Sequence, residues 1–168
     1  ARALAGRLGI SAAGDWTGLG GQEACITALE DADWDRRLRA AAWLAGQGDR
    51  ACIGPLRRGL AAETATLVAD KAYGPRYRIK ELCIIALHRL RDVGSVEALQ
   101  ALLTREEFYG VRRLAAQALA DLGSASSIPH LERWTQDADL ETACAARAAI
   151  AAISGRIPRD HRQPVVPA

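Results

Sequence analysis

The stretch VRRLAAQALADLG at residues 111–123, followed by IPHL at residues 128–131, decides the fold of this chain. Its pattern returns when the sequence is shifted back by 32 or by 75 residues, and again when it is shifted forward by 31. A repeat of this length is typical of stacked supersecondary units rather than of one closed globule. The matching core positions are Ile79, Leu82, Ala86 and Leu87, then Ala40, Ala41, Leu44 and Leu56, then Ala146, Ala149, Ile150 and Ile153.

Each repeat reads as two helices, here called helix A and helix B, joined by a short turn. Sustained period-2 alternation bounded by turns is absent from the sequence, so strands are not predicted. Neither helix can bury its apolar stripe alone, and the units must therefore stack into an all-α fold. The expected helices are residues 2–9, 22–30, 35–46, 49–58, 60–71, 76–91, 94–104, 109–122, 125–136 and 139–153.

These units predict a single repeat domain over residues 1–154, with an irregular first unit at 1–30 and an extended or disordered tail at 155–168. The spacing breaks once: Arg37 to Lys80 is 43 residues, eleven more than the 32 from Lys80 to Arg112. The excess is assigned to an insertion at 59–75, and insertions often map to the binding face of a repeat protein. The regular units are about 31–60, 74–104, 106–136 and 138–154.

Composition restricts the class of partner. The 168 residues include 22 basic and 20 acidic side chains, and a net charge of +2 does not by itself indicate a nucleic acid or a membrane surface. No apolar run approaches the ~18 residues of a membrane span, and the first residues lack the apolar stretch of a secretory signal. A cytoplasmic protein without a membrane partner is therefore expected.

The VRRLAAQALADLG motif with its following IPHL resembles the HEAT-like repeat of the phycobilin-lyase type, over about residues 22–153. The resemblance implies a right-handed α-solenoid (superhelix) of stacked helical hairpins, HEAT-like or ARM-type, in a bacterial-type protein that acts mainly as a scaffold or partner-binding module. Two features depart from the pattern. Arg91 stands at the turn position that Gly48 and Gly123 occupy, and Ala143 replaces the helix A base in the last unit, as in an end-capping repeat.

Several conspicuous residues recur at fixed repeat positions and are expected to be structural. The residue that opens each helix A is predicted to lie at the seam between neighbouring units. An acidic and a basic repeat position are predicted to form ion pairs between repeats. The cysteines are predicted to be reduced thiols packed in the core. The seam residues are Trp34, Tyr77, Tyr109 and Leu140, the acids Asp31, Glu106 and Asp137, the bases Arg37, Lys80 and Arg112, and the cysteines Cys25, Cys52, Cys83 and Cys144.

Catalysis is not predicted. Each of the three histidines is followed by a residue other than Glu, so the His-Glu pairs of metal-dependent HEAT-like hydroxylases are missing. The glycine-rich stretch at residues 14–21 lacks both a preceding strand and the Lys-Ser/Thr end of a phosphate loop. No ordered Ser or Cys triad is visible. We therefore expect a non-enzymatic chain with no catalytic residue, cofactor or metal ligand.

The predicted function is a scaffold or adaptor that binds a protein partner through a concave surface formed by the helix B elements. On helix B, the face opposite the core residues should present Pro55 together with Arg58, Glu97, His130 and Arg133. A second candidate patch, beside the insertion, consists of Tyr73, Arg76 and Arg78. Two alternatives remain open at this point: a nucleic-acid-binding or DNA-repair solenoid, which is the less favoured partner class, and a lyase-like or chaperone-like module. The oligomeric state is also open.

Overall fold

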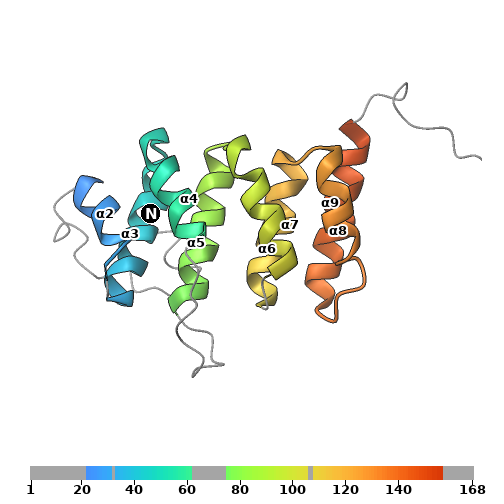
Figure 1. Ribbon diagram of the computed structural model, residues 1–168. Coiled ribbons are helices and arrows are strands. Elements are labelled where there is room, and N and C mark those ends of the chain that lie inside the picture. Colours follow the sequence, from blue (N-terminus) through green and yellow to red (C-terminus); the bar gives the residue numbers. More distant parts are fainter. Residues whose placement is uncertain (1–21, 32, 62–74, 106–107, 157–168) are drawn as a thin grey trace, which may run out of the picture. The chain divides into compact units, whose positions relative to one another are not determined.

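The computed structural model describes residues 22–31, 33–61, 75–105 and 108–156, and all regular structure in these ranges is helical (Figure 1). The expected helix at 2–9, the glycine-rich stretch at 14–21 and most of the insertion lie outside the described residues. The helices are α2 (Gln22–Ala28), α3 (Trp34–Gln47), α4 (Ile53–Ala61), α5 (Pro75–Arg89), α6 (Val96–Arg105), α7 (Tyr109–Leu122), α8 (Ile128–Glu132) and α9 (Leu140–Arg156), with 3₁₀ turns η2 (Arg50–Cys52), η3 (Val93–Ser95) and η4 (Ala125–Ser127).

The chain divides into two compact units, residues 1–98 (unit 1) and 99–168 (unit 2), and the division falls inside α6. In unit 1, α3 packs against α2 and α5, and α4 packs against α5. In unit 2, α7 packs along α9, and α8 packs against η4 and α9. Within each unit, one helix A packs on the next (α3 on α5, α7 on α9) and a helix B packs on the following helix A (α4 on α5, α8 on α9), as in stacked repeats.

The cores of both units consist of residues that the repeat pattern placed inside. Unit 1 buries Leu44, Leu56 and Leu87, while unit 2 buries Leu119 and Leu131. Between α7 and α9 most of the buried residues are alanines, whose small side chains let two helices approach closely. These alanines are Ala115, Ala116, Ala118, Ala143, Ala145, Ala146 and Ala149.

Three of the predicted helix B elements, α4, α6 and α8, each follow directly after a 3₁₀ turn. Asp49 caps η2 by accepting a hydrogen bond from the Ala51 amide at 2.9 Å, and the Ser95 hydroxyl donates to the Asp92 carbonyl at 2.7 Å. The last residue of each turn is buried, and it is a cysteine or serine at the same repeat position, namely Cys52, Ser95 or Ser127. A small, weakly polar side chain therefore marks the point where helix B enters the core.

The helix predicted at 125–136 was too long, because the α-helix ends at Glu132. The amides of Trp134 and Thr135 bond to carbonyls three residues earlier, and the Thr135 hydroxyl donates to the Glu132 carbonyl at 2.9 Å. Bonds of this i→i+3 type tighten the chain into turns. Arg147 then donates both Nε and Nη2 to the Thr135 carbonyl, which fixes the end of this segment onto α9.

The three equivalent turn positions adopt different backbone conformations. Gly48 has φ 72° and Arg91 has φ 53°, so both lie in the left-handed region that glycine enters more easily than arginine. Gly123 has φ −71°, and its reason for being glycine is space: a Cβ would lie 2.6 Å from the Leu119 carbonyl oxygen and 2.9 Å from Ser127 Oγ. The same position in the repeat is thus constrained by torsion in one unit and by packing in the other.

The seam prediction is wrong for two of its four residues. Tyr109 is half-exposed and stacks on Phe108 at 4.8 Å, and Leu140 is 70% exposed. The junction of α7 with α9 is made instead by the Thr142 hydroxyl, which donates to the Tyr109 carbonyl at 3.3 Å. Because a backbone carbonyl and a small side chain form the contact, the large side chains project outward. The side chains of Trp34 and Tyr77 lie outside the described residues.

The cysteines are packed at three of the four positions. Cys25, Cys52 and Cys83 are buried, and burial raises the pKa of the Cys83 thiol to about 12. The prediction is wrong for Cys144, which is exposed on α9. Cys144 lies between Ala143 and Ala145, which are both buried, and its own side chain points to the open face of α9.

Candidate partner-binding site

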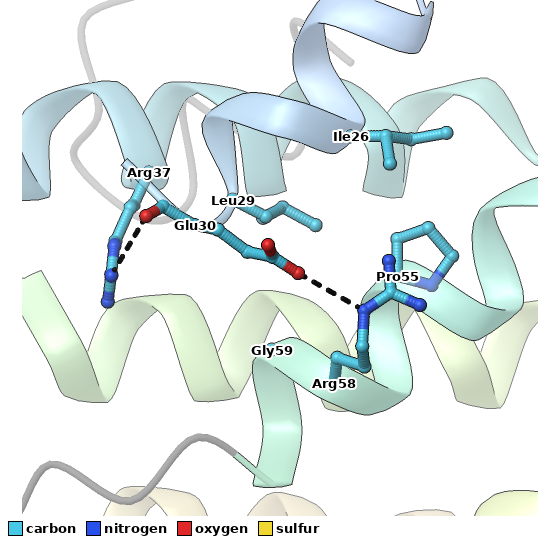
Figure 2. A pocket seen from close by; sticks show the side chains of 7 residues that line it. All are labelled: Ile26, Leu29, Glu30, Arg37, Pro55, Arg58 and Gly59. Atoms are coloured by element: carbon cyan, nitrogen blue, oxygen red, sulfur yellow. Dashed lines mark hydrogen bonds and ion pairs between the residues drawn. The ribbon is translucent and has the colours of Figure 1, made fainter. Parts of the chain in front are cut away.

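A pocket in unit 1 lies between α2 and α4, the helix B elements of the first two repeats. It has a volume of about 170 Å³. Figure 2 shows its lining: an apolar part from Ile26, Leu29, Pro55 and Gly59, and a polar rim from Glu30, Arg37 and Arg58. Gly59 brings α4 close to α5, since a Cβ there would lie 3.1 Å from Cys83 Sγ. The site is a small apolar hollow with charged edges.

An ion pair spans the rim. Arg58 Nε lies 3.2 Å from Glu30 Oε1, and the side chains are 60% and 70% exposed, so this pair contributes at most about 1 kcal/mol to stability. Arg37 approaches the same edge from α3 and donates to the backbone carbonyls of Glu30, at 3.3 Å, and of Asp31. The Glu30 carboxylate thus contacts Arg58, whereas Arg37 is held at the backbone carbonyls on the other side of Glu30 (Figure 2).

A second charged contact holds the other side of α4 in place. Arg57 Nε donates to Asp92 Oδ2 at 2.7 Å, and its Nη2 bonds the other carboxylate oxygen. The Arg57 guanidinium thereby lowers the pKa of Asp92, with further hydrogen bonds from Gly94 and Ser95 acting in the same direction. Arg57 and Arg58 are adjacent in sequence, yet Arg57 joins α4 to the next repeat while Arg58 faces the pocket.

The predicted site residues are distributed over both units. Arg58 lies at the pocket, and Glu97 is exposed on α6. In unit 2, His130 on α8 and Arg133 just after it are exposed, and Arg133 lies over the Trp134 ring at 5.4 Å. In the second predicted patch, Tyr73 lies outside the described residues, as do the side chains of Arg76 and Arg78 on α5.

Pro55 does not face outward as predicted, because it is buried and lines the pocket with Ile26. The prediction oriented helix B from Ile53 and Leu56 alone, whereas α4 packs against α5 and also borders α2. The sequence reasoning missed Glu30 as a partner of Arg58. One signal could have found it, since Glu30, just after α2, occupies the repeat position that Arg57 occupies in α4, and Arg57 contacts the next repeat.

The predicted inter-repeat ion pair is confirmed in unit 2. Arg112 Nη2 lies 2.9 Å from Asp137 Oδ2, and the side chains are only 11% and 3% exposed. Arg112 also lies over the Trp134 ring at 4.6 Å, and Asp137 accepts a hydrogen bond from the Asp139 amide at 2.8 Å. In unit 1, Asp31 at the equivalent acidic position pairs with Arg36 at 2.9 Å. Glu106 lies outside the described residues.

The described residues contain neither a metal site nor a membrane-spanning helix. No group of three or more His, Cys, Asp or Glu side chains within this part of the chain is arranged to hold a metal ion. In the same residues, no helix is both long and apolar enough to span a membrane.

Residues 64–154 match the family model for HEAT repeats, while no curated protein matches the sequence. A chain in the complex of CpcE and CpcF of phycocyanin lyase from Nostoc sp. PCC7120 is similar in structure, with a TM-score of 0.64 and 23% identity over 80% of this chain. An engineered protein is similar at a TM-score of 0.56 and 23% identity over 81% of this chain. The matches cover 54% and 63% of those chains, so this chain spans about half the length of the phycocyanin lyase chain. Similarity at this level of identity shows a shared helical-repeat fold.

Proposed function

This chain belongs to the HEAT-repeat family, and we propose that it is a non-enzymatic scaffold or adaptor domain that binds a protein partner through the surface of its helix B elements. The observation that carries the proposal is the pocket between α2 and α4, where two consecutive helix B elements present an apolar hollow and the exposed Arg58. The proposal treats residues 1–154 as the repeat domain. Exposed His130 and Arg133 in unit 2, and the patch of Tyr73, Arg76 and Arg78, are further candidate contacts.

The charges of the described residues support a protein rather than a polyanion as the partner. Five arginines make ion pairs with carboxylates, which lowers the positive charge they offer to phosphates. The pairs are Arg36–Asp31, Arg57–Asp92, Arg58–Glu30, Arg112–Asp137 and Arg113–Glu141. In a mobility-shift assay at low salt, we expect no retention of duplex or single-stranded DNA. Salt-dependent retention would favour a nucleic-acid-binding solenoid instead.

The main test compares single charge reversals on the immobilised full chain. The wild-type chain should capture a protein partner from a lysate of the source organism, and the purified pair should bind with a measurable Kd. The Arg58→Glu variant should fail to capture that protein. Arg89→Glu is the matched control, because Arg89 is exposed on α5 and does not line the pocket. Arg133→Glu makes the same test in unit 2. Capture and Kd that are unchanged by both Arg58→Glu and Arg133→Glu would reject the helix B surface.

A second candidate function is a lyase-like or chaperone-like module, which the similarity to a phycocyanin lyase chain supports. That structure is a complex of two proteins, so the fold is compatible with binding a protein chain. The test is co-expression of this chain with a phycocyanin subunit and its chromophore. Co-purification of the subunit, or a chromophore absorbance band on either chain, would support this candidate. If the subunit does not co-purify and no absorbance band appears, the chain is instead a scaffold for a different partner.

A further inference from the structure

We propose that the pocket between α2 and α4 binds one apolar side chain of a partner peptide, of leucine or phenylalanine size, while Arg58 binds a carboxylate next to that side chain. This inference rests on the proposed function and names the chemistry of the partner. The segment recognised is therefore an acidic–apolar motif in an extended or loop conformation.

The volume of the pocket sets the size of the group that it takes. Its volume of about 170 Å³ is close to the roughly 150 Å³ of an apolar protein cavity that holds one benzene molecule. Pockets for whole drug-sized ligands or cofactors begin at about 300 Å³. One leucine or phenylalanine side chain matches the space, and a nucleotide or large cofactor does not.

The lining sets the polarity of that group. Ile26 on α2, Leu29 just after it and Pro55 on α4 supply apolar surface, and Gly59 of α4 completes the lining (Figure 2). Burial of an apolar side chain against such a surface is favourable because it removes apolar area from water. The bottom of the pocket thus selects a hydrophobic side chain.

The rim sets the charge of the neighbouring group. Arg37 holds the end of α2 through the backbone carbonyls of Glu30 and Asp31, which leaves Arg58 as the cation that faces Glu30 across the opening. Glu30 and Arg58 are both mostly exposed, so their pair is weak and is exchanged readily for a carboxylate from a partner. Glu30 in the free protein then occupies the position of the partner's carboxylate, and the positive charge of Arg58 favours an acidic over a basic segment.

The experiment is a titration of the ¹⁵N-labelled full chain, followed by amide chemical shifts, with four capped dipeptides. The dipeptides are N-acetyl-Leu-Glu-amide, N-acetyl-Leu-Gln-amide, N-acetyl-Leu-Lys-amide and N-acetyl-Ser-Glu-amide, each added up to about 20 mM to reach the weak affinity of a fragment. Leu-Glu should shift the amides of residues 26–30 and 56–59, with a Kd about threefold below that of Leu-Gln. A factor of this size is what one exposed ion pair supplies. Leu-Lys and Ser-Glu should bind more weakly than Leu-Glu.

Three variants separate the parts of the proposal. Glu30→Gln removes the internal competitor and should lower the Kd for Leu-Glu about threefold, while Arg58→Gln should raise it about threefold and make Leu-Glu and Leu-Gln equal. Ile26→Trp fills the pocket and should weaken both leucine peptides alike. Glu23→Gln on α2 and Arg89→Gln on α5, which change exposed charges away from the pocket lining, should leave every Kd unchanged.

Glu30→Gln and Arg58→Gln are expected to change the Kd for Leu-Glu in opposite directions, and this difference decides between the outcomes. If Leu-Lys binds more tightly than Leu-Glu, or if Glu30→Gln weakens binding, the partner's charge is basic and the proposal is wrong. Shifts outside residues 26–30 and 56–59, or no saturable shifts, also overturn it. If the dipeptides fail but Arg58→Glu still abolishes capture of the protein partner, only the motif is wrong; if capture is also unaffected, the proposed use of this surface fails.

Discussion

The two units join consecutive repeats with an arginine–aspartate pair, but they place the pair in different surroundings. In unit 2, Arg112 and Asp137 are almost fully buried, and alanines bring α7 and α9 close together. In unit 1, Asp92 is 6% exposed but Arg57 is 42% exposed. The pocket of unit 1 lies at a separate contact, between α2 and α4. The pair of unit 2 is thus shielded from water on both sides, whereas the arginine of the unit 1 pair is partly open to solvent.

The largest expected effect is at the buried pair of unit 2. Arg112→Ala leaves Asp137 buried without its cation, and loss of one partner of a buried pair costs about 3–5 kcal/mol. Asp137 keeps a hydrogen bond from the Asp139 amide, so we expect the free energy of unfolding to fall by about 3 kcal/mol, the lower end of this range. Urea unfolding followed by circular dichroism measures this loss. Arg89→Ala should change the free energy of unfolding by less than about 0.5 kcal/mol. A loss below about 1 kcal/mol for Arg112→Ala would make the two junctions equivalent.

The turn glycines provide the next comparison. Gly123→Ala places a Cβ 2.6 Å from the Leu119 carbonyl oxygen, and forced overpacking costs about 1–3 kcal/mol. Gly48→Ala meets no atom within 4 Å but must keep φ near 72°, at a cost of about 1 kcal/mol. We therefore expect Gly123→Ala to lower the midpoint of thermal unfolding more than Gly48→Ala. The reverse order would show that the contacts around Gly123 yield easily and cost less than the left-handed torsion at Gly48.

The pair of Arg57 with the buried Asp92 in unit 1 predicts a pH-dependent difference in stability. Arg57 lowers the pKa of Asp92 in the folded state, so the contribution of Asp92 is present above the unfolded carboxyl pKa of about 3.9 and is lost as the pH falls through the folded value. Asp92→Asn should lower the free energy of unfolding by about 1–2 kcal/mol at pH 7. The gap to wild type should shrink when unfolding is measured below about pH 4. A gap that persists at pH 2.5 would mean that the carboxylate charge is not responsible.

The smallest expected effect is at Arg91. Replacing the left-handed Arg91 by glycine removes about 1–2 kcal/mol of backbone strain. Glycine also raises the entropy of the unfolded chain, which lowers the stability by about 0.5–1 kcal/mol. Arg91→Gly should therefore stabilise unit 1 by about 0.5 kcal/mol, measured as a rise in the urea midpoint. Arg89→Gly is the control, because Arg89 is helical and glycine there should destabilise. A destabilised Arg91→Gly would show that the arginine side chain makes a contact worth more than the strain.

Helix positions were largely predictable from local pattern. The helix predicted at 109–122 matches α7 in both bounds, since the spacing of apolar residues and the following glycine report local geometry. The prediction for residues 125–136 was too long, because the side-chain and i→i+3 bonds around Thr135 that end α8 early do not change the apolar spacing. Tyr109 and Leu140 were placed wrongly because a recurring large apolar side chain at the first turn of a helix does not by itself imply burial.

In the candidate site, the exposure of one lining residue, Arg58, was predictable from the sequence. Arg58 was expected on an exposed helix B face, and the structure places it there. Glu30 and Pro55 were not assigned to it, because the contact between Arg58 and Glu30 joins residues 28 positions apart on different helices. Helical periodicity describes one helix at a time, and it does not say which neighbouring helix a side chain meets.

The sequence by itself determined the HEAT-type repeat, the order of its helices and the residues that form the buried stripes, because the period of apolar residues follows from the geometry of the α-helix. Only the tertiary structure decided that Arg57 and Arg58 face different neighbours, that the turn at Arg91 is left-handed while that at Gly123 is close-packed, and that α2 and α4 leave a pocket. Those outcomes depend on the distance and rotation between packed helices. Side-chain volume at each contact sets that distance and rotation, and the repeat pattern leaves it free.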